Sequence, residues 1–129
     1  MDNLFVNVPI VLGGTAALGT TNVFAFHAPA DGKGGGITVQ KVNFYSKDAV
    51  AAASAPSFEL VTLGTNSAIN GTICAATGSS AFTAGTAKAA TISNAWVDGD
   101  YRVAVKWIQT AVNADQLYCN AGISYVMGK

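Results

Sequence analysis

Apolar and polar residues alternate along most of this chain. The alternation is most regular over residues 101–107 and again over 117–127, where every second side chain is apolar or aromatic. A period of two residues is that of a β-strand with one buried face. We therefore predict that these two runs pair as a closing β-hairpin, which begins after the turn-forming residues 98–100.

The run over residues 4–11 alternates in the same way and contains Pro9. Proline has no N–H to donate to a central ladder, so the segment is predicted to be an edge strand or an arm that lies along another surface. We assign residues 1–14 to this edge strand or assembly arm. We also expect that removing residues 1–11 weakens assembly more than folding.

Shorter apolar runs predict further strands over residues 22–28, 37–45, 58–63, 68–74 and 89–92. In the second of these the alternation shifts phase, which predicts a bulge near Gln40-Lys41. Asn70-Gly71 predicts a tight turn or a bulge in the fourth. Residues 49–55 are predicted to form a short helix, with Asp48 as its N-cap and Pro56 as its stop.

Residues 75–91 are almost entirely Ala, Gly, Ser and Thr around a single large apolar residue, Phe82. This segment is either a functional or mobile loop or a simple crossover between sheets. The whole pattern gives about eight strands, glycine-rich connections and negligible helix. We therefore predict that residues 1–129 form one domain, an all-β antiparallel sandwich that is jelly-roll-like.

Charged residues make up only 11% of the chain, and the formal net charge is zero. Ordinary soluble domains carry about 25% charged residues, so we infer that partners cover part of this surface. No cluster of Lys and Arg could neutralise several phosphates, which argues against nucleic acid as a partner.

No apolar run reaches about 18 residues, and the N-terminal residues lack the positive charge of a signal peptide. We therefore expect no membrane partner and no export by that route.

Residues that could carry chemistry are few and scattered. His27 is the only histidine, and Asp98 and Asp100 stand in a turn, although with backbone carbonyls they could hold calcium. Cys74 and Cys119 lack the paired spacing of metal ligands. We expect them to be buried free thiols, with a disulfide as the alternative. We predict no enzymatic activity and no cofactor or metal.

Residues 31–36 form a glycine-rich segment that superficially resembles a phosphate-binding loop. It has neither GxGxxG nor P-loop spacing, and a predicted strand follows it in place of a helix. We predict a hairpin or corner loop, with an adaptable contact surface as the alternative.

Aromatic residues gather in and near the predicted closing hairpin: Trp96, Tyr101, Trp107, Tyr118 and Tyr125. Their expected role is core packing, and a sugar-binding surface is the alternative. The alternative function that follows is an adhesion or carbohydrate-binding module, either a head-fibre domain or a pilin-like subunit.

The C-terminal third also carries a family resemblance. Residues 95–105 read AWVDGDYRVAV, and a terminal strand over residues 123–128 reads ISYVMG. These segments, together with size and composition, resemble the decoration or cement proteins of tailed bacteriophages. The resemblance implies a jelly-roll or similar β-fold that assembles as trimers on the outside of an icosahedral head and stabilises it. It implies no catalytic residues.

The expected function is therefore that of a virion structural protein, made in the host cytoplasm and located on the capsid surface. Its expected partners are the major capsid protein and further copies of itself, in a homo-oligomer of trimeric type. This chain departs from that family in lacking an obvious basic or proline-rich N-terminal arm, so the use of residues 4–11 as the capsid-contacting arm is our own inference and is not implied by the resemblance. The candidate interface residues are Leu4, Phe5, Val6, Val8, Pro9, Ile10, Lys33, Gly34, Gly35 and Phe82.

Overall fold

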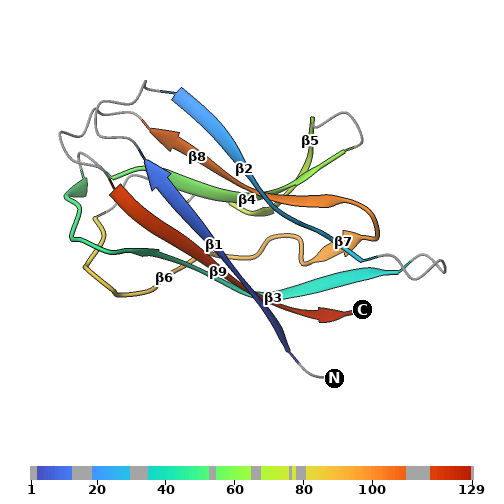
Figure 1. Ribbon diagram of the computed structural model, residues 1–129. Coiled ribbons are helices and arrows are strands. Elements are labelled where there is room, and N and C mark those ends of the chain that lie inside the picture. The colour runs from blue at the N-terminus through green and yellow to red at the C-terminus, as the bar shows by residue number, and fades with distance from the viewer. Residues whose placement is uncertain are drawn as a thin grey trace.

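A computed structural model gives the fold of this chain as two packed β-sheets (Figure 1). It describes residues 3–12, 19–29, 35–52, 55–64, 68–75, 77, 81–109 and 117–128. The strands are β1 (Leu4–Leu12), β2 (Gly19–His27), β3 (Gly36–Ser46), β4 (Ser57–Leu63), β5 (Ile69–Cys74), β6 (Lys88–Ala89), β7 (Trp96–Asp98), β8 (Arg102–Gln109) and β9 (Leu117–Met127). The described residues contain no α-helix. The predicted all-β sandwich is confirmed.

All strand pairs in the described part of the chain are antiparallel. One sheet has the order β1-β9-β3-β6, with β7 also paired to β3, and the other has the order β2-β8-β4-β5. The edge position predicted for the first strand is confirmed, because β1 stands at the end of its sheet.

The strand pairs follow a simple rule: the chain runs back along itself as a two-stranded ribbon. β1 pairs with β9, β2 with β8, β3 with both β7 and β6, and β4 with β5. The midpoint of the pair Leu4 and Tyr125 is residue 64.5, and that of Gly36 and Asp98 is residue 67. The ribbon then rolls up, so that β9 also pairs with β3 and β8 with β4. A rolled antiparallel ribbon in two sheets is a jelly roll.

The predicted closing hairpin is wrong. β8 and β9 lie in different sheets, and each pairs with strands from the first half of the chain. The alternation along each run reports which face is buried, but it carries no information about the neighbouring strand. The connection between the two strands, residues 110–116, lies outside the described residues.

The predicted helix over residues 49–55 is also wrong in its described part. Val50 forms an isolated antiparallel bridge with Phe82, in which each backbone N–H donates to the other residue's carbonyl, at 3.0 and 2.9 Å. The described part of the segment holds only a short 3₁₀ turn at Ala52. Val50 is buried in the core, so packing its side chain outweighs the weak helix preference of a short run. Residues 53 and 54 lie outside the description.

The predicted bulges are confirmed. The register of β3 against β9 shifts between Val39 and Lys41, which leaves Gln40 as the extra residue. The register of β4 against β5 shifts so that Asn70 is skipped. The strand predicted near residues 89–92 is shorter in the structure, with β6 ending at Ala89 and an isolated bridge joining Ile92 to Cys74.

The core lies between the inner faces of the two sheets. Phe44 of one sheet stacks on Phe58 of the other, with ring centroids 5.1 Å apart, and Phe82 meets Phe58 edge-on at 5.9 Å. All three rings are buried. Fully burying an aromatic or large aliphatic side chain contributes about 1.5–3 kcal/mol to folding. The segment around Phe82 is therefore anchored to the sandwich at this ring.

Candidate functional site

The interface residues predicted in β1 divide between its two faces. Phe5 and Pro9 are exposed on the outward face, whereas Val8 and Ile10 lie in the hydrophobic core. Leu4 is partly exposed, and Val6 packs half-buried against the core. β1 is therefore an edge strand built into the sandwich, and its exposed residues are the outward ones together with Leu4 at its start.

The remaining predicted interface residues lie apart from β1. Lys33 and Gly34 are outside the described residues. Gly35 is half-buried, and its carbonyl oxygen accepts a hydrogen bond from the Gly99 N–H at 2.6 Å. Phe82 is only 3% exposed, and the Nζ of Lys88 lies 3.7 Å from the centroid of its ring. The side chain of Phe82 therefore belongs to the core.

The outward residues of β1 continue across its neighbours into one surface, which we call the β1–β9–β3 face. Strand register places these outward residues side by side. The face consists of Phe5, Asn7, Pro9, Val11, Tyr118, Asn120, Gly122, Ser124, Lys41, Asn43 and Tyr45.

Exposed apolar side chains stand at the two ends of this face, with Phe5 at one end and Val11 and Tyr118 at the other. Phe5 is 69% exposed, and its ring lies over Gly122, where a Cβ atom would meet the ring at 3.2 Å. Val11 and Tyr118 are directly paired across the strands and are 55% and 46% exposed. The Asn120 Nδ2 donates to the Asn7 Oδ1 at 2.7 Å. Because these two amide groups bond to each other, fewer of their donors and acceptors need hydrogen bonds from water.

The charge of the β1–β9–β3 face is small and of one sign. Its three strands contain no acidic residue and only one basic residue, Lys41. Lys47 follows β3, and its Nζ lies 5.6 Å from the centroid of the Tyr118 ring. The opposite sheet is different, because Lys106 and Glu59 form a salt bridge on it at 3.8 Å. The two outer surfaces of the sandwich are therefore chemically unlike.

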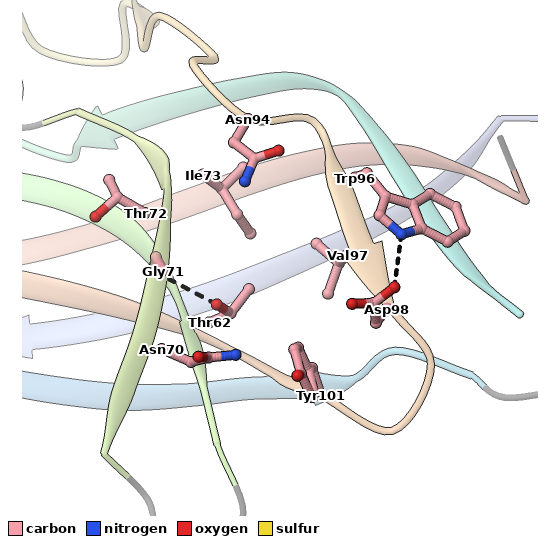
Figure 2. Close-up of a pocket in the computed structure, with 10 residues that line it drawn as sticks. All are labelled: Thr62, Asn70, Gly71, Thr72, Ile73, Asn94, Trp96, Val97, Asp98 and Tyr101. Carbon is pink, nitrogen blue, oxygen red and sulfur yellow. Dashed lines mark hydrogen bonds between the residues drawn. The ribbon is translucent and has the colours of Figure 1, made fainter. Parts of the chain in front are cut away.

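A second candidate site is a cleft of about 240 Å³ between the sheets, at the edge formed by β5 and β7 (Figure 2). β5 forms one wall and the segment that includes β7 forms the other, with side chains from β4 and from the turn before β8 between them. Its lining residues are Thr62, Asn70, Gly71, Thr72, Ile73, Asn94, Trp96, Val97, Asp98 and Tyr101. The sequence singled out Trp96 and Tyr101 as possible sugar contacts and Asp98 as a possible calcium ligand, but it did not predict that Asn70 and Asn94 line a cleft with them.

The residues considered for catalysis show a different arrangement. His27 is exposed and meets the ring of Phe24 edge-on at 5.5 Å. His27 and Asp100 both line a hollow of about 380 Å³ with Arg102, whose guanidinium donates to the Gly64 carbonyl. The described residues that line this hollow include no Ser, Thr or Cys nucleophile. Asp100 has a φ of 70° and stands in a turn, as its sequence context predicts.

The two cysteines are free and buried, as predicted. Cys74 lies in β5 and Cys119 in β9, which belong to different sheets. Burial raises the pKa of the Cys74 thiol to about 11. Burial also raises the pKa of Cys119, against the opposing effect of a hydrogen bond with Ser46. Thiols whose pKa lies above the ordinary value are poor nucleophiles near neutral pH.

Among the described residues, no three His, Cys, Asp or Glu side chains gather closely enough to hold a metal ion. Nor does that part of the chain contain a helix with the length and apolar character needed to cross a bilayer. Comparisons of this chain with protein-family models, with curated proteins and with solved structures found no match. Its function is therefore inferred from geometry and chemistry alone.

Proposed function

We propose that this chain is a virion structural protein, a capsid decoration or cement protein that binds the outside of an icosahedral head. The observation that supports this most is the β1–β9–β3 face. It exposes Phe5 at one end and Val11 and Tyr118 at the other, and its three strands carry no acidic residue. A surface that exposes aromatic and aliphatic side chains and carries few charges is typical of a protein–protein contact.

The chemistry of the face also indicates the kind of surface that it fits. The major capsid protein would present apolar side chains to Phe5 and Val11, with acidic groups at the rim near Lys41 and Lys47. Such contacts are individually modest. Several copies arranged as a symmetric oligomer, of which a trimer is our proposal, convert modest contacts into high avidity. The protein would be made in the host cytoplasm, act on the capsid surface and need no cofactor or catalytic residue.

The alternative of an adhesion module is less well supported. Its biochemical marker would be a disulfide between Cys74 and Cys119, since such modules act in oxidising surroundings. The two thiols are buried and free, in different sheets. The jelly-roll fold does not distinguish between the capsid and the adhesion function, because this architecture occurs in both viral capsid and lectin domains.

Two substitutions on the β1–β9–β3 face test the proposal. In the double variant Phe5→Ser/Val11→Ser, two exposed apolar side chains are lost and the core residues of β1 are unchanged. The matched control is Phe24→Ser, because Phe24 is 53% exposed on β2, the edge strand of the opposite sheet. The binding partner is a shell assembled from the major capsid protein encoded by a neighbouring gene. We expect the double variant to bind these shells at least tenfold more weakly than the wild type does, and the control to bind like the wild type.

Light scattering on a sizing column and co-sedimentation with expanded shells are the measurements. Far-UV circular dichroism checks that both variants keep their strands. A wild-type protein that is strictly monomeric and does not sediment with shells would contradict the proposal. So would equal losses of binding in the double variant and in Phe24→Ser.

A further inference from the structure

The cleft between β5 and β7 lies where two sheet edges face each other without a ladder between them. Its position is fixed by the backbone: the N–H groups of Ser93 and Asn94 donate to the Ile73 carbonyl at 2.9 and 3.3 Å. The Ser93 hydroxyl donates to the same carbonyl at 3.2 Å. The Val39 N–H donates to the Ala95 carbonyl at 2.8 Å. Both walls are therefore held to the sandwich, and the cleft is formed before any ligand arrives.

The cleft has an apolar base and polar walls. Ile73 and Val97 are almost completely buried, and Tyr101 packs half-buried against the core. Above them stand the amides of Asn70 and Asn94, both on exposed residues. Figure 2 shows the Asn70 and Asn94 side chains coming from opposite walls toward the same space, whereas the Thr72 side chain points away from it.

Some of these polar groups have hydrogen-bond partners among the described residues, and others do not. The Trp96 Nε1 donates to the Asp98 Oδ1 at 2.7 Å, and the Thr62 hydroxyl donates weakly to the Gly71 carbonyl at 3.4 Å. The amides of Asn70 and Asn94 make no side-chain hydrogen bond to the described part of the chain. An amide both donates and accepts, and a carboxylate accepts about four hydrogen bonds. Asp98 therefore retains acceptor capacity after its bond with Trp96.

These groups define the chemistry of a ligand. Amides that donate and accept match hydroxyl groups, which do the same. The Asp98 carboxylate accepts from hydroxyl groups and repels anions, and the described residues that line the cleft include no other carboxylate and no cationic side chain to offset it. A half-buried tyrosine ring at the base suits the apolar C–H face of a ring-shaped ligand. The volume of about 240 Å³ is below the roughly 300–1,000 Å³ of pockets for drug-sized molecules.

We propose that the cleft between β5 and β7 binds one neutral pyranose unit, such as the terminal sugar of a glycan. Asn70 and Asn94 bind its hydroxyl groups from opposite walls, Asp98 accepts a hydrogen bond from a third hydroxyl, and Tyr101 lies against the sugar ring. Trp96 is a positioning residue, because it holds the Asp98 carboxylate. This site is separate from the β1–β9–β3 face and does not depend on the proposed capsid function.

Nuclear magnetic resonance titration of the full chain with glucose, galactose, mannose and N-acetylglucosamine, each alone, tests the proposal. We expect at least one sugar to shift the backbone amide signals of residues 70–73 and 94–98, with a dissociation constant on the order of 1 mM for a ligand of about twelve heavy atoms. Glucuronate, which differs from glucose by a carboxylate, should bind severalfold more weakly. In Asp98→Asn that difference should disappear.

Two conservative variants measure the contribution of the lining residues. Asn94→Ala and Asn70→Ala should each weaken sugar binding about threefold to tenfold, the range expected for one hydrogen bond. Asn3→Ala is the matched control, since Asn3 is an exposed amide next to β1 and should bind like the wild type. Folding of each variant is checked by the dispersion of its spectrum. The proposal is overturned if no sugar shifts cleft signals at 50-fold the expected constant of about 1 mM, or if Asn94→Ala and Asn70→Ala both bind with unchanged affinity.

Discussion

At the scale of single residues, Gly36 shows how closely two strands of this sandwich approach each other. A Cβ atom on Gly36 would lie 2.2 Å from the Val97 carbonyl oxygen and 2.8 Å from the Trp96 ring. A backbone oxygen in a strand cannot move aside cheaply, so any side chain here must separate β3 from β7.

We predict that Gly36→Ala lowers the free energy of unfolding by about 2–3 kcal/mol, at the upper end of overpacking substitutions. Gly122→Ala is the control, because its nearest neighbour, at 3.2 Å, is the ring end of the exposed Phe5 side chain, which can shift. The same substitution there should cost less than about 1 kcal/mol. Urea denaturation followed by tryptophan fluorescence measures both, and equal losses would contradict the prediction.

The buried thiols make stability depend on alkaline pH. The pKa of Cys74 is about 11 in the folded protein against an ordinary 9.0, so between these values the unfolded chain binds fewer protons than the native state. Stability contributed by the neutral thiol is thus fully present below pH 9 and is lost as the pH rises toward 11. We predict a lower urea midpoint at pH 10 than at pH 8. The drop should be smaller in Cys74→Ala, and an equal drop in the two proteins would refute this origin.

At the scale of elements, β1 shows what an alternating pattern can and cannot reveal. The pattern predicted its length and edge position correctly, because period and proline are local signals. Its contribution to the core was missed. Val8 and Ile10 lie among residues contributed by strands far away in the sequence, such as Phe44 and Ile123. No local signal reports that neighbourhood.

This burial reverses the expectation that the segment serves assembly more than folding. We predict that deleting residues 1–11 removes about 3–6 kcal/mol through the loss of Val8 and Ile10, a large share of the usual 5–15 kcal/mol of a domain. The truncated chain should be mostly unfolded by circular dichroism at 37 °C. Pro9→Ala, a change on the exposed side of the same strand, should stay within about 0.5 kcal/mol of the wild type. A stable, cooperative truncated monomer would restore the view of β1 as an arm.

The cleft between β5 and β7 illustrates why the site was harder to predict than the strands. Its polar residues come from β4, from β5 and from the segment around β7, and only the rolled sheets bring them together. Trp96 and Tyr101 could be noticed because aromatic residues stand out in any sequence. Asn70 and Asn94 could not, since an isolated Asn most often indicates a turn.

At the scale of the whole molecule, the ribbon arrangement explains both the success and the failure of the predicted topology. Strand number and spacing are sufficient to predict a jelly-roll-like sandwich. Partner choice is not local: β8 and β9 were predicted to pair with each other, yet each is bound to a strand about 80 to 120 residues earlier, as the pairs Val23 with Val105 and Leu4 with Tyr125 show. Pairing across such distances is decided by closing two sheets around one core.

The ribbon also predicts where the chain tolerates a break. Both chain ends leave the structure near the β1–β9 pair (Figure 1), and the ribbon turns back between β4 and β5. We predict that a circular permutant, with the original ends joined by a short Gly/Ser linker and new ends within residues 65–67, keeps the native fold. It should lose only about 1–2 kcal/mol, because one short loop closure replaces another.

The control permutant has its new ends between Val42 and Asn43, in the middle of β3, where pairs on both sides would be interrupted. It should fail to fold. Far-UV circular dichroism and cooperative urea unfolding distinguish the two permutants. An unfolded or aggregated permutant with ends at 65–67 would show that the ribbon does not govern which breaks are accepted.

The nested order of the strand pairs in the ribbon also affects the order in which they can form while the chain is being synthesised. Because β4 and β5 are neighbours at the centre and β1 pairs with β9, the first strand to leave the ribosome must wait for the last before its ladder can form. The nascent chain can close only its innermost strands early, and the outer ones follow from the middle outward. If synthesis ends before residue 117, the released polypeptide has a first strand with apolar side chains and no β9 to pair with. Such fragments would be ready substrates for chaperones and proteases.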